Sequence, residues 1–383
     1  MAQKLLIIIL IIPLCLVAGC WNQVNVNDTA VVSGIGVDLT DNKKIQLVTQ
    51  INKPVNQQTS SEDSQYIVAS ATGDTLTEAA RKVVLTLPRL PLWSHADTFI
   101  IGEKLAREDL SLILDFAFRN RNIRMANSVL ISHNSSLDEL YNSDCPLSLC
   151  SSRGIQKILL TQERLLGIYV PITLQEFIVK TISPGVDSFA PMVSVTKDLQ
   201  DKDILTINGT AVFKGPKMAG ILNVTESRGL FWLNAKQNNG AAMSVSFPQK
   251  PDIKVTIELY EIKTKIRPRI EDNQIFMDIS VQANSNIEEI VGDFSQQNPK
   301  FVAEIENAAE KQIKSQIEAC ILKGQELNSD FLGFGRNIYG HYPEYWEKIQ
   351  DNWYNYYPQV ETNIDVKVSL ILSELIKYNI YQK

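Results

Sequence analysis

The chain has 383 residues, of which 44% are hydrophobic and 21% are charged, and its formal net charge is −6. These are the proportions of an ordinary globular protein, and the basic residues are not gathered into the kind of patch that nucleic-acid binding requires. The chain is longer than one hydrophobic core usually serves, so two or three domains are expected.

The N-terminal residues predict export and attachment to lipid. Lys4 precedes an apolar run over residues 5–18, which is shorter than the about 20 residues that span a bilayer and fits a secretory signal. The run ends in Leu16-Val17-Ala18-Gly19-Cys20, which has the spacing of a lipobox. We therefore predict a signal peptide over residues 1–19 and a lipidated Cys20, carrying acyl chains such as palmitate, as the first residue of the mature chain. A plain signal peptide with an incidental cysteine is the alternative.

Three further cysteines remain in the mature chain, namely Cys145, Cys150 and Cys320. Cys145 and Cys150 could close a small disulfide outside the cytoplasm, or both could be unpaired thiols, and the sequence leaves the two alternatives open. The chain has three histidines, none of them at ligand spacing near this pair. No metal site and no cofactor are therefore predicted.

The N-terminal half of the mature chain is predicted to mix strands and helices. Residues 20–28 predict a lipidated tether. Alternation and turn signals then predict strands at residues 30–37, 45–51, 66–71, 98–101 and 125–131, the first two joined as a hairpin. Helices are expected from residue 76, over residues 105–118 and 155–166, and at the capping boxes that begin at Ser136 and Thr173.

The C-terminal half predicts longer elements. A hairpin is expected at residues 205–222, followed by a strand over residues 253–266 with a bulge between Leu259 and Tyr260, and by its antiparallel partner at residues 275–283. A helix from Pro299, ended by Gly324, would be roughly 37 Å long. A second helix from Pro343 and a strand at residues 364–372 complete the chain.

Polar segments at residues 183–185 and 197–203 mark the expected domain boundary. We predict an N-terminal α+β domain over residues 29–196 and a C-terminal α+β domain over residues 197–383, with a further division near residue 250 as an alternative. The fold class is α+β, multi-domain, with mostly antiparallel sheets packed with helices. The apolar stripe of the long helix is expected to pack on the strands through Ile257, Ile279 and Val368.

Side chains that could carry chemistry favour structural roles. Gly34-Ile35-Gly36-Val37-Asp38 lacks the third glycine of a nucleotide-binding turn and leads into a hairpin instead of a helix. His95, Asp97 and Glu103 are the nearest approach to an acid–base group. Phosphate-binding, zinc-binding and serine-hydrolase motifs are missing from the sequence, so no enzyme is predicted.

Two clusters have alternative interpretations. Arg119, Arg121 and Arg124 are expected to form a solvated edge, with an anion site as the alternative. Trp346 and Trp353 lie seven residues apart on one side of a helix. We expect them in the core, and a partner-binding aromatic face is the alternative.

These features, in this order, resemble the Ger(x)C family, the C subunits of bacterial spore germinant receptors. The resemblance covers nearly all of the mature chain. It departs at residues 22–25 and 377–379, where family members often have charged residues and an Arg/Gly-containing segment. The motifs that carry it are Gly19-Cys20-Trp21, residues 34–38, residues 101–107, Arg119 and Arg124, residues 209–213 with 220–222, and Gly333-Phe334-Gly335 followed by Pro343, Trp346 and Trp353.

The resemblance implies a non-enzymatic receptor subunit, lipid-anchored to the outer face of the cell membrane, which is the inner membrane of the spore. It would work beside a polytopic A subunit and a transporter-like B subunit in a nutrient-triggered assembly. A solute-binding lipoprotein of a transporter is the competing hypothesis and would need two lobes of repeated βαβ units. A lipid-anchored cell-wall hydrolase is a third, disfavoured because the catalytic motifs are missing.

Overall fold

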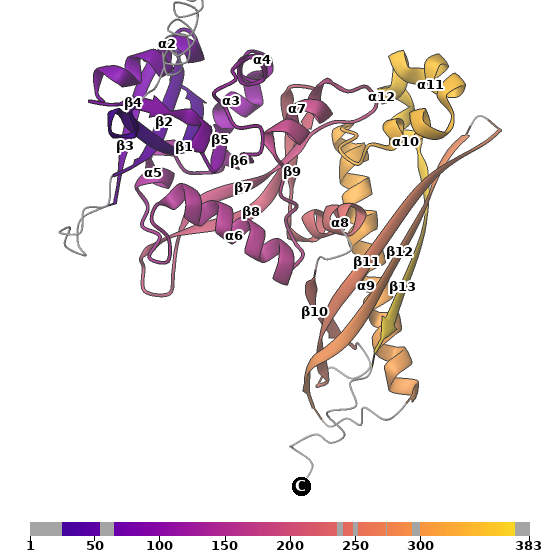
Figure 1. The fold of residues 1–383 in the computed structure, drawn as a ribbon. Helices are drawn as coiled ribbons and strands as arrows, with labels where there is room; N and C mark the ends of the chain where they lie inside the picture. The colour runs from indigo at the N-terminus through magenta and orange to yellow at the C-terminus, as the bar shows by residue number, and fades with distance from the viewer. Residues whose placement is uncertain are drawn as a thin grey trace, which may run out of the picture.

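The structure is a computed structural model that describes residues 25–53, 65–235, 240–247, 252–272, 274–292 and 299–371. The predicted signal peptide and Cys20 lie outside these described residues. Two sheets organise the described chain, and they occupy its two ends in Figure 1. Within these residues no helix is long and apolar enough to cross a membrane.

The first sheet has the strand order β3-β2-β1-β5-β6-β7-β8-β9, with β4 paired to β1 outside this path. Its centre is parallel (β1 with β5, β5 with β6, β6 with β7), whereas both sides are antiparallel hairpins. Its strands are β1 (Thr29–Leu39), β2 (Ile45–Asn52), β3 (Tyr66–Gly73), β4 (Leu90–Leu92), β5 (Thr98–Gly102), β6 (Ser128–Ser132), β7 (Phe189–Lys197), β8 (Asp203–Lys214) and β9 (Lys217–Leu222).

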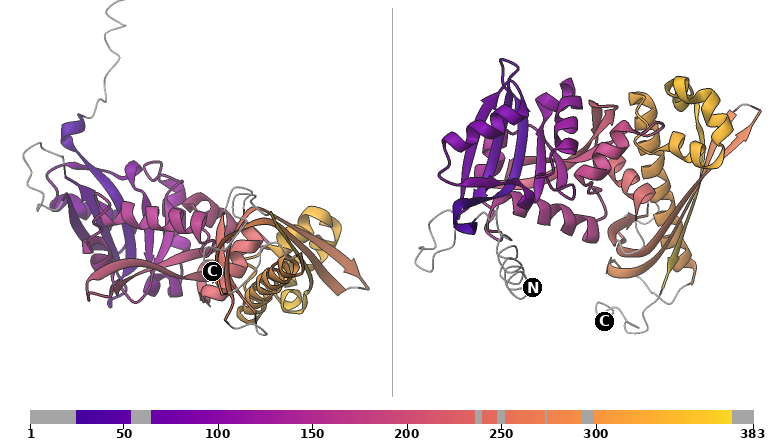
Figure 2. Two further views of the ribbon diagram at one scale, coloured as in Figure 1. Left: turned by 90° about the horizontal axis from the view of Figure 1, so that it is seen from below. Right: turned by 45° about the horizontal axis from the view of Figure 1, so that its top comes forward.

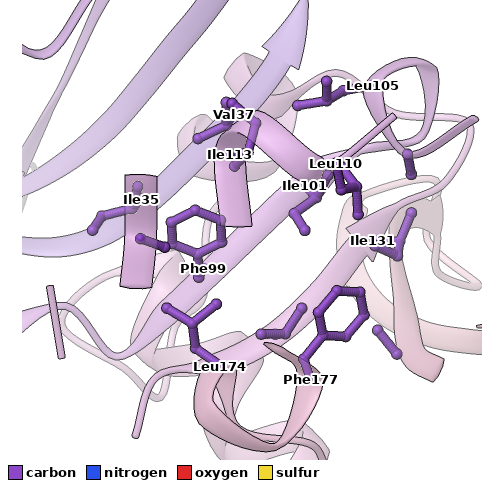
Figure 3. Packing of buried hydrophobic residues seen from close by; sticks show 14 of the residues in the cluster. Ile35, Val37, Phe99, Ile101, Leu105, Leu110, Ile113, Ile131, Leu174 and Phe177 are labelled. Atoms are coloured by element: carbon purple, nitrogen blue, oxygen red, sulfur yellow. The ribbon is translucent and has the colours of Figure 1, made fainter. Parts of the chain in front are cut away.

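Helices cover both faces of this sheet, as Figure 2 shows. The period-two alternation of the strands decides which side chain faces which layer, because successive side chains point to opposite faces. Phe99 and Ile101 join the core under α2, α3, α4 and α7, whereas Ile100 between them joins the core under α5 and α6. The first of these cores is drawn in Figure 3. These helices are α2 (Leu76–Lys82), α3 (Glu103–Glu108), α4 (Ser111–Arg119), α5 (Leu137–Asn142), α6 (Ser151–Leu165) and α7 (Leu174–Ile182).

The second sheet has the order β10-β11-β12-β13. Its strands are β10 (Ala241–Ser246), β11 (Lys254–Glu271), β12 (Gln274–Val291) and β13 (Glu361–Leu370), and β13 runs parallel to β12. The register of β11 against β12 shifts between Tyr260 and Lys263, where Glu261 has a φ of 52°. The predicted bulge is therefore present, one to two residues further along the strand.

Two helices join the sheets. In α8 (Val224–Asn234), Leu230 packs in the first core, whereas Phe231 and Trp232 pack in the core of the second sheet. In α9 (Pro299–Leu327), Cys320 packs in the first core and Ile321 packs in the core of the second sheet. The Nε1 of Trp232 donates a hydrogen bond of 2.7 Å to the Oε1 of Gln316, both of them buried, and so ties α8 to α9.

The remaining elements are short. They are α10 (Phe334–His341), α11 (Pro343–Ile349) and α12 (Trp353–Tyr356), and the 3-10 helices η1 (Val26–Asp28), η2 (Val83–Leu85), η3 (Trp93–His95), η4 (Gln350–Asn352) and η5 (Tyr357–Gln359). The three α-helices lie together beside one end of α9 in Figure 1.

The α+β fold class is confirmed, and so is the packing of the long helix. Its buried side chains Ile305, Ile313 and Ile317 share one core with Ile257, Ile279 and Val368. The end of this helix was predicted wrongly, because it continues through Gly324 to Leu327. Gly324 is buried where an added Cβ would come within 2.5 Å of the Tyr357 hydroxyl, so this glycine marks a close contact and not a helix end.

Two other expectations differ from the structure. The helix expected over residues 105–118 is two helices, because Asp109 is extended and Leu110 begins a new turn. The helix from Pro343 is likewise interrupted at residues 350–352. Both sheets are mixed, because parallel pairs of β1, β5, β6 and β7, and of β13 with β12, stand beside the antiparallel hairpins. The position of the predicted domain boundary, between residues 196 and 197, lies near the end of β7, which pairs with β8.

Candidate functional site: a buried carboxylate junction between the sheets

The most unusual polar cluster of the described chain lies where the two sheets meet. Asp187 lies in the loop before β7, and Asp330 lies in the loop between α9 and α10. Both are buried, with exposed fractions of 1% and 0%. An ionised carboxylate at such a depth is costly unless hydrogen bonds satisfy its oxygens.

The two aspartates are linked through the backbone. The Asp330 N–H donates to the Oδ2 of Asp187 at 2.7 Å, and the Asp187 N–H donates to the Asp330 carbonyl at 2.9 Å. The Oδ1 of Asp187 accepts from the Gly215 N–H at 2.8 Å and from the Tyr354 hydroxyl at 2.9 Å. Asp187 therefore joins the β8–β9 turn of the first sheet to α12 of the C-terminal part.

Asp330 organises the start of α10. Its Oδ1 accepts from the Phe334 N–H at 2.9 Å, and its Oδ2 accepts from the Gly335 N–H at 2.8 Å and the Trp353 Nε1 at 3.0 Å. Gly333, between the aspartate and the helix, has a φ of 73°, a conformation that favours glycine. The aspartate thus satisfies N–H groups that the first turn of a helix leaves without partners.

Aromatic rings and glycines close the junction. The Trp346 and Trp353 rings lie 5.4 Å apart, and the Trp353 and Tyr357 rings lie 5.9 Å apart. A Cβ added to Gly185 or to Gly335 would come within 2.7 Å of the Trp346 ring. These glycines let the loop before β7 and the first turn of α10 approach one another, and the Arg336 N–H donates to the Gly185 carbonyl at 2.8 Å.

Burial controls the charge of this cluster. It raises the pKa of Asp330 to about 7, an effect that the Gly335 and Phe334 N–H groups oppose and the Asp187 carboxylate reinforces. Burial also raises the pKa of Asp187 and lowers the pKa of Lys180. Lys214 lies over the Tyr354 ring, with its Nζ 4.4 Å from the ring centroid. Within the described residues, neither carboxylate has a cation at ion-pair distance, so hydrogen bonds are their main partners.

The chemistry of the junction is that of a fixed connection. Both carboxylates are enclosed, and their oxygens are occupied by donors from the chain itself. A buried network of polar groups whose hydrogen bonds are all made is rigid. The cluster therefore holds the first sheet and the C-terminal helices in one relative position.

The residues predicted from the sequence have separate places. Trp346 and Trp353 are both buried, each 2% exposed, within the core of the second sheet. Cys145 and Cys150 are both free thiols in this structure, Cys150 being buried. Cys20 lies outside the described residues. Arg119 and Arg121 are exposed, and Arg119 pairs with Asp115 one turn earlier in α4.

The three residues considered as an acid–base group have different partners. Asp97 pairs with Arg153 at 3.1 Å, whereas the His95 Nδ1 lies 3.2 Å from the Ser94 hydroxyl. Glu103 pairs with His133 at 2.7 Å and with Arg107 on its own helix. Sequence reasoning missed His133, because it follows another strand of the sheet.

The Gly34–Asp38 motif is structural, as predicted. Asp38 accepts hydrogen bonds from the Leu39 and Leu105 N–H groups, at 2.8 and 3.0 Å. It lies so close to Gly102 that an added Cβ there would overlap its carboxylate. The two sequence motifs at residues 34–38 and 101–107 are therefore two sides of one contact between β1 and the start of α3.

Two protein-family models match the chain in order, and the boundary between them falls within the first sheet, near the turn from β7 to β8. The family model described as "Spore germination protein N-terminal domain" matches residues 22–195, and the model "Spore germination B3/ GerAC like, C-terminal" matches residues 208–373. Both are models of spore germination proteins, and together they cover both sheets.

Curated relatives of this chain are also spore germination proteins, and a solved structure shares its fold. Spore germination protein KC of Bacillus subtilis (strain 168) is 28% identical over 384 residues, covering 95% of this chain and 93% of the relative. Spore germination protein B3 of the same organism is 23% identical over 380 residues, covering 94% and 95%. The crystal structure of the GerBC protein has a TM-score of 0.59 at 20% identity and covers 88% of this chain and 97% of that chain, which shows a shared fold.

The fold and the junction define a two-sheet α+β protein whose halves are fixed to one another by a buried carboxylate cluster. With both domain models matched in order, the chain belongs to the Ger(x)C family of spore germination proteins. The family predicted from the sequence motifs is thereby confirmed.

Proposed function

We propose that this chain is the non-enzymatic, lipid-anchored C subunit of a nutrient germinant receptor, on the outer face of the membrane beside polytopic A and B subunits. The main support is the ordered pair of germination-protein domains over residues 22–373. The lipobox before Cys20 supports the anchor, because the same chain then has a signal for export and a site for lipid.

The anchor is tested by Cys20→Ala in the full chain. We expect this variant to accumulate as an unprocessed precursor or to leave the membrane fraction, and spores that carry it should lose the nutrient response that depends on this chain. Incorporation of labelled lipid is the direct measurement, with Cys320→Ala as a cysteine control that should label normally. Normal lipid labelling of Cys20→Ala would reject the predicted attachment site.

The non-enzymatic role is tested at Glu103, the carboxylate nearest to an acid–base role. Glu103 is bound to His133 and Arg107, so Glu103→Gln should change stability or assembly without abolishing a turnover. The measurement is peptidoglycan hydrolysis by the purified chain and by the variant. Hydrolysis that is present in the parent chain and disappears with Glu103→Gln would establish a hydrolase and overturn the proposal.

The solute-binding lipoprotein remains the alternative and makes a different forecast. Such a protein would bind its solute alone, whereas a receptor subunit would co-purify with A and B subunits from dormant-spore membranes. The antiparallel pairing of β10, β11 and β12 does not give the second sheet the repeated βαβ units of a solute-binding lobe. Co-purification is therefore the experiment that separates the two.

A further inference from the structure

Several described segments lie together at one end of the first sheet, next to the predicted tether. β1 begins at Thr29, and β4 pairs with it there, Leu90 lying opposite Thr29. β2 ends at this same end with Asn52, and α2 returns to it after β3. A hollow of about 490 Å³ between these segments is lined by Asn27, Ile51 and Leu87 among others. The segment after α2 and the base of the tether are thus neighbours.

This end exposes apolar and basic side chains together. Leu85 is 85% exposed, Leu90 is 53% exposed and Val84 is 44% exposed. Four basic residues surround them, and the acidic residues in the same segments are Asp28 and Glu78, the latter paired with Lys82. We call this surface the tether-end patch, and it consists of Val84, Leu85 and Leu90 with Lys53, Arg81, Lys82 and Arg89.

The charge of the patch is opposite to that of the molecule. The whole chain has a net charge of −6, whereas the patch is basic. Apolar side chains among lysines and arginines are typical of surfaces that lie in the interface of an anionic bilayer. Large exposed apolar side chains on a surface of this kind usually mark an interaction site.

The length of the tether limits how far this patch can lie from the lipid. The described chain begins at Asn25, five positions after Cys20, and a span of five positions reaches at most about 18 Å when fully extended. A lipid on Cys20 would therefore keep the base of β1, and the patch beside it, within reach of the headgroups.

We propose that the tether-end patch lies on the surface of an anionic phospholipid bilayer and orients the chain with this end of the first sheet toward the membrane. The proposal rests on the lipid attachment at Cys20 given above as the proposed function. The lipid would supply attachment, and the patch would supply orientation, with Leu85 and Leu90 among the acyl chains and the arginines at the phosphates.

The test compares two leucines at opposite ends of the sheet. Leu199, at the turn after β7, is fully exposed, and it lies at the far end because β7 follows the direction of β1 through the parallel pairs. Leu85→Cys and Leu199→Cys are made in the full chain with Cys145→Ser, since Cys150 and Cys320 are buried. Each is labelled with an environment-sensitive dye and reconstituted, as the lipidated protein, into vesicles of phosphatidylglycerol and phosphatidylcholine.

We expect spin-labelled lipids to quench the dye at position 85 and not at position 199. Each basic residue near an anionic surface changes, by about fivefold, the ratio of molecules whose patch lies on the membrane to molecules whose patch does not. The double variant Arg81→Gln with Arg89→Gln should therefore lower this ratio about 25-fold. Quenching at position 85 should also be weaker in vesicles of phosphatidylcholine alone, which have no anionic lipid.

The outcomes separate this proposal from the anchor. Equal quenching at positions 85 and 199 in a chain whose N-terminal peptide carries lipid would overturn the patch and leave the anchor intact. Quenching at position 85 in a membrane-bound chain without lipid on Cys20 would overturn the anchor and support the patch. A dye at position 85 that is shielded in spore membranes but unquenched in pure vesicles would assign the surface to a protein partner and reject the proposal.

Discussion

We expect Trp353→Ala to lower the thermal unfolding midpoint of the chain, to reduce the amount of subunit in spores and to abolish the dependent germination response. The side chain is 2% exposed and packs against the rings of Trp346 and Tyr357. Truncating a buried aromatic of this size costs about 3–5 kcal/mol, a large share of the about 5–15 kcal/mol that a domain has.

The hydrogen bond of Trp353 adds to this loss. Its Nε1 donates to the Oδ2 of the buried Asp330 at 3.0 Å, and losing one hydrogen bond of this kind costs about 0.5–1.5 kcal/mol, because the Gly335 N–H still donates to the same oxygen. Trp353→Phe keeps one aromatic ring but removes the donor and part of the ring volume, so its destabilisation should lie between those of the parent chain and Trp353→Ala. The measurement is the order of the three unfolding midpoints.

An exposed aromatic provides the matched control. Tyr339 on α10 is 56% exposed, and its replacement by alanine should change stability by no more than about 0.5 kcal/mol. An unchanged midpoint for Trp353→Ala, together with lost co-purification of the A and B subunits, would assign Trp353 to a partner-binding face and reject the core assignment.

Period-two and helical patterns in the sequence predicted most of the second sheet and its helix. Strands β11, β12 and β13 each have one buried face, so apolar residues alternate along them, and α9 has a single stripe facing that sheet. Such patterns are local, and they predict an element wherever one side of it is buried and the other is solvated.

The centre of the first sheet could not be predicted in the same way. All five residues of β5 and of β6 are buried, because helices cover both faces. A strand buried on both faces has no alternation, and pairing between parallel strands is set by the connections and not by a turn. The sequence therefore predicted these strands without their partners or their direction.

The buried carboxylate junction could not be predicted from the sequence for a different reason. Asp187 and Asp330 are 143 residues apart, and neither lies in a motif that predicts a buried carboxylate. The motif Gly333-Phe334-Gly335 was recognised by its resemblance, but its aspartate partner became apparent only from the hydrogen bonds of Asp330 to the N–H groups of residues 334 and 335. Tertiary contacts give this aspartate its role.

That role leads to a pH dependence centred on Asp330. Burial raises the pKa of Asp330 to about 7 in the folded chain, from 3.8 for the unperturbed group. Between about pH 4 and pH 7 the folded chain therefore holds a proton that the unfolded chain has released. Under this linkage the stability of the fold decreases as the pH rises through that window and becomes independent of Asp330 above it.

The free energy of unfolding should decrease by on the order of 4 kcal/mol through Asp330 between about pH 4 and pH 7. The raised pKa of Asp187 acts in the same direction. The test is urea unfolding of the full chain between pH 4 and pH 8, with Asp330→Asn as the variant. An asparagine cannot titrate, so the decrease in stability with pH should be much smaller in this variant, even though the variant itself is less stable.

Asp201→Asn is the matched control, because Asp201 lies in the exposed turn between β7 and β8 at a φ of 61°, which asparagine tolerates. This control should keep the pH dependence of the parent chain. A full decrease that persists in Asp330→Asn would show that another group titrates, and a chain that becomes more stable from pH 4 to pH 7 would show that the junction binds an ionised Asp330. Either result would reject the prediction that ionisation of Asp330 in the carboxylate junction lowers the stability of the fold toward neutral pH.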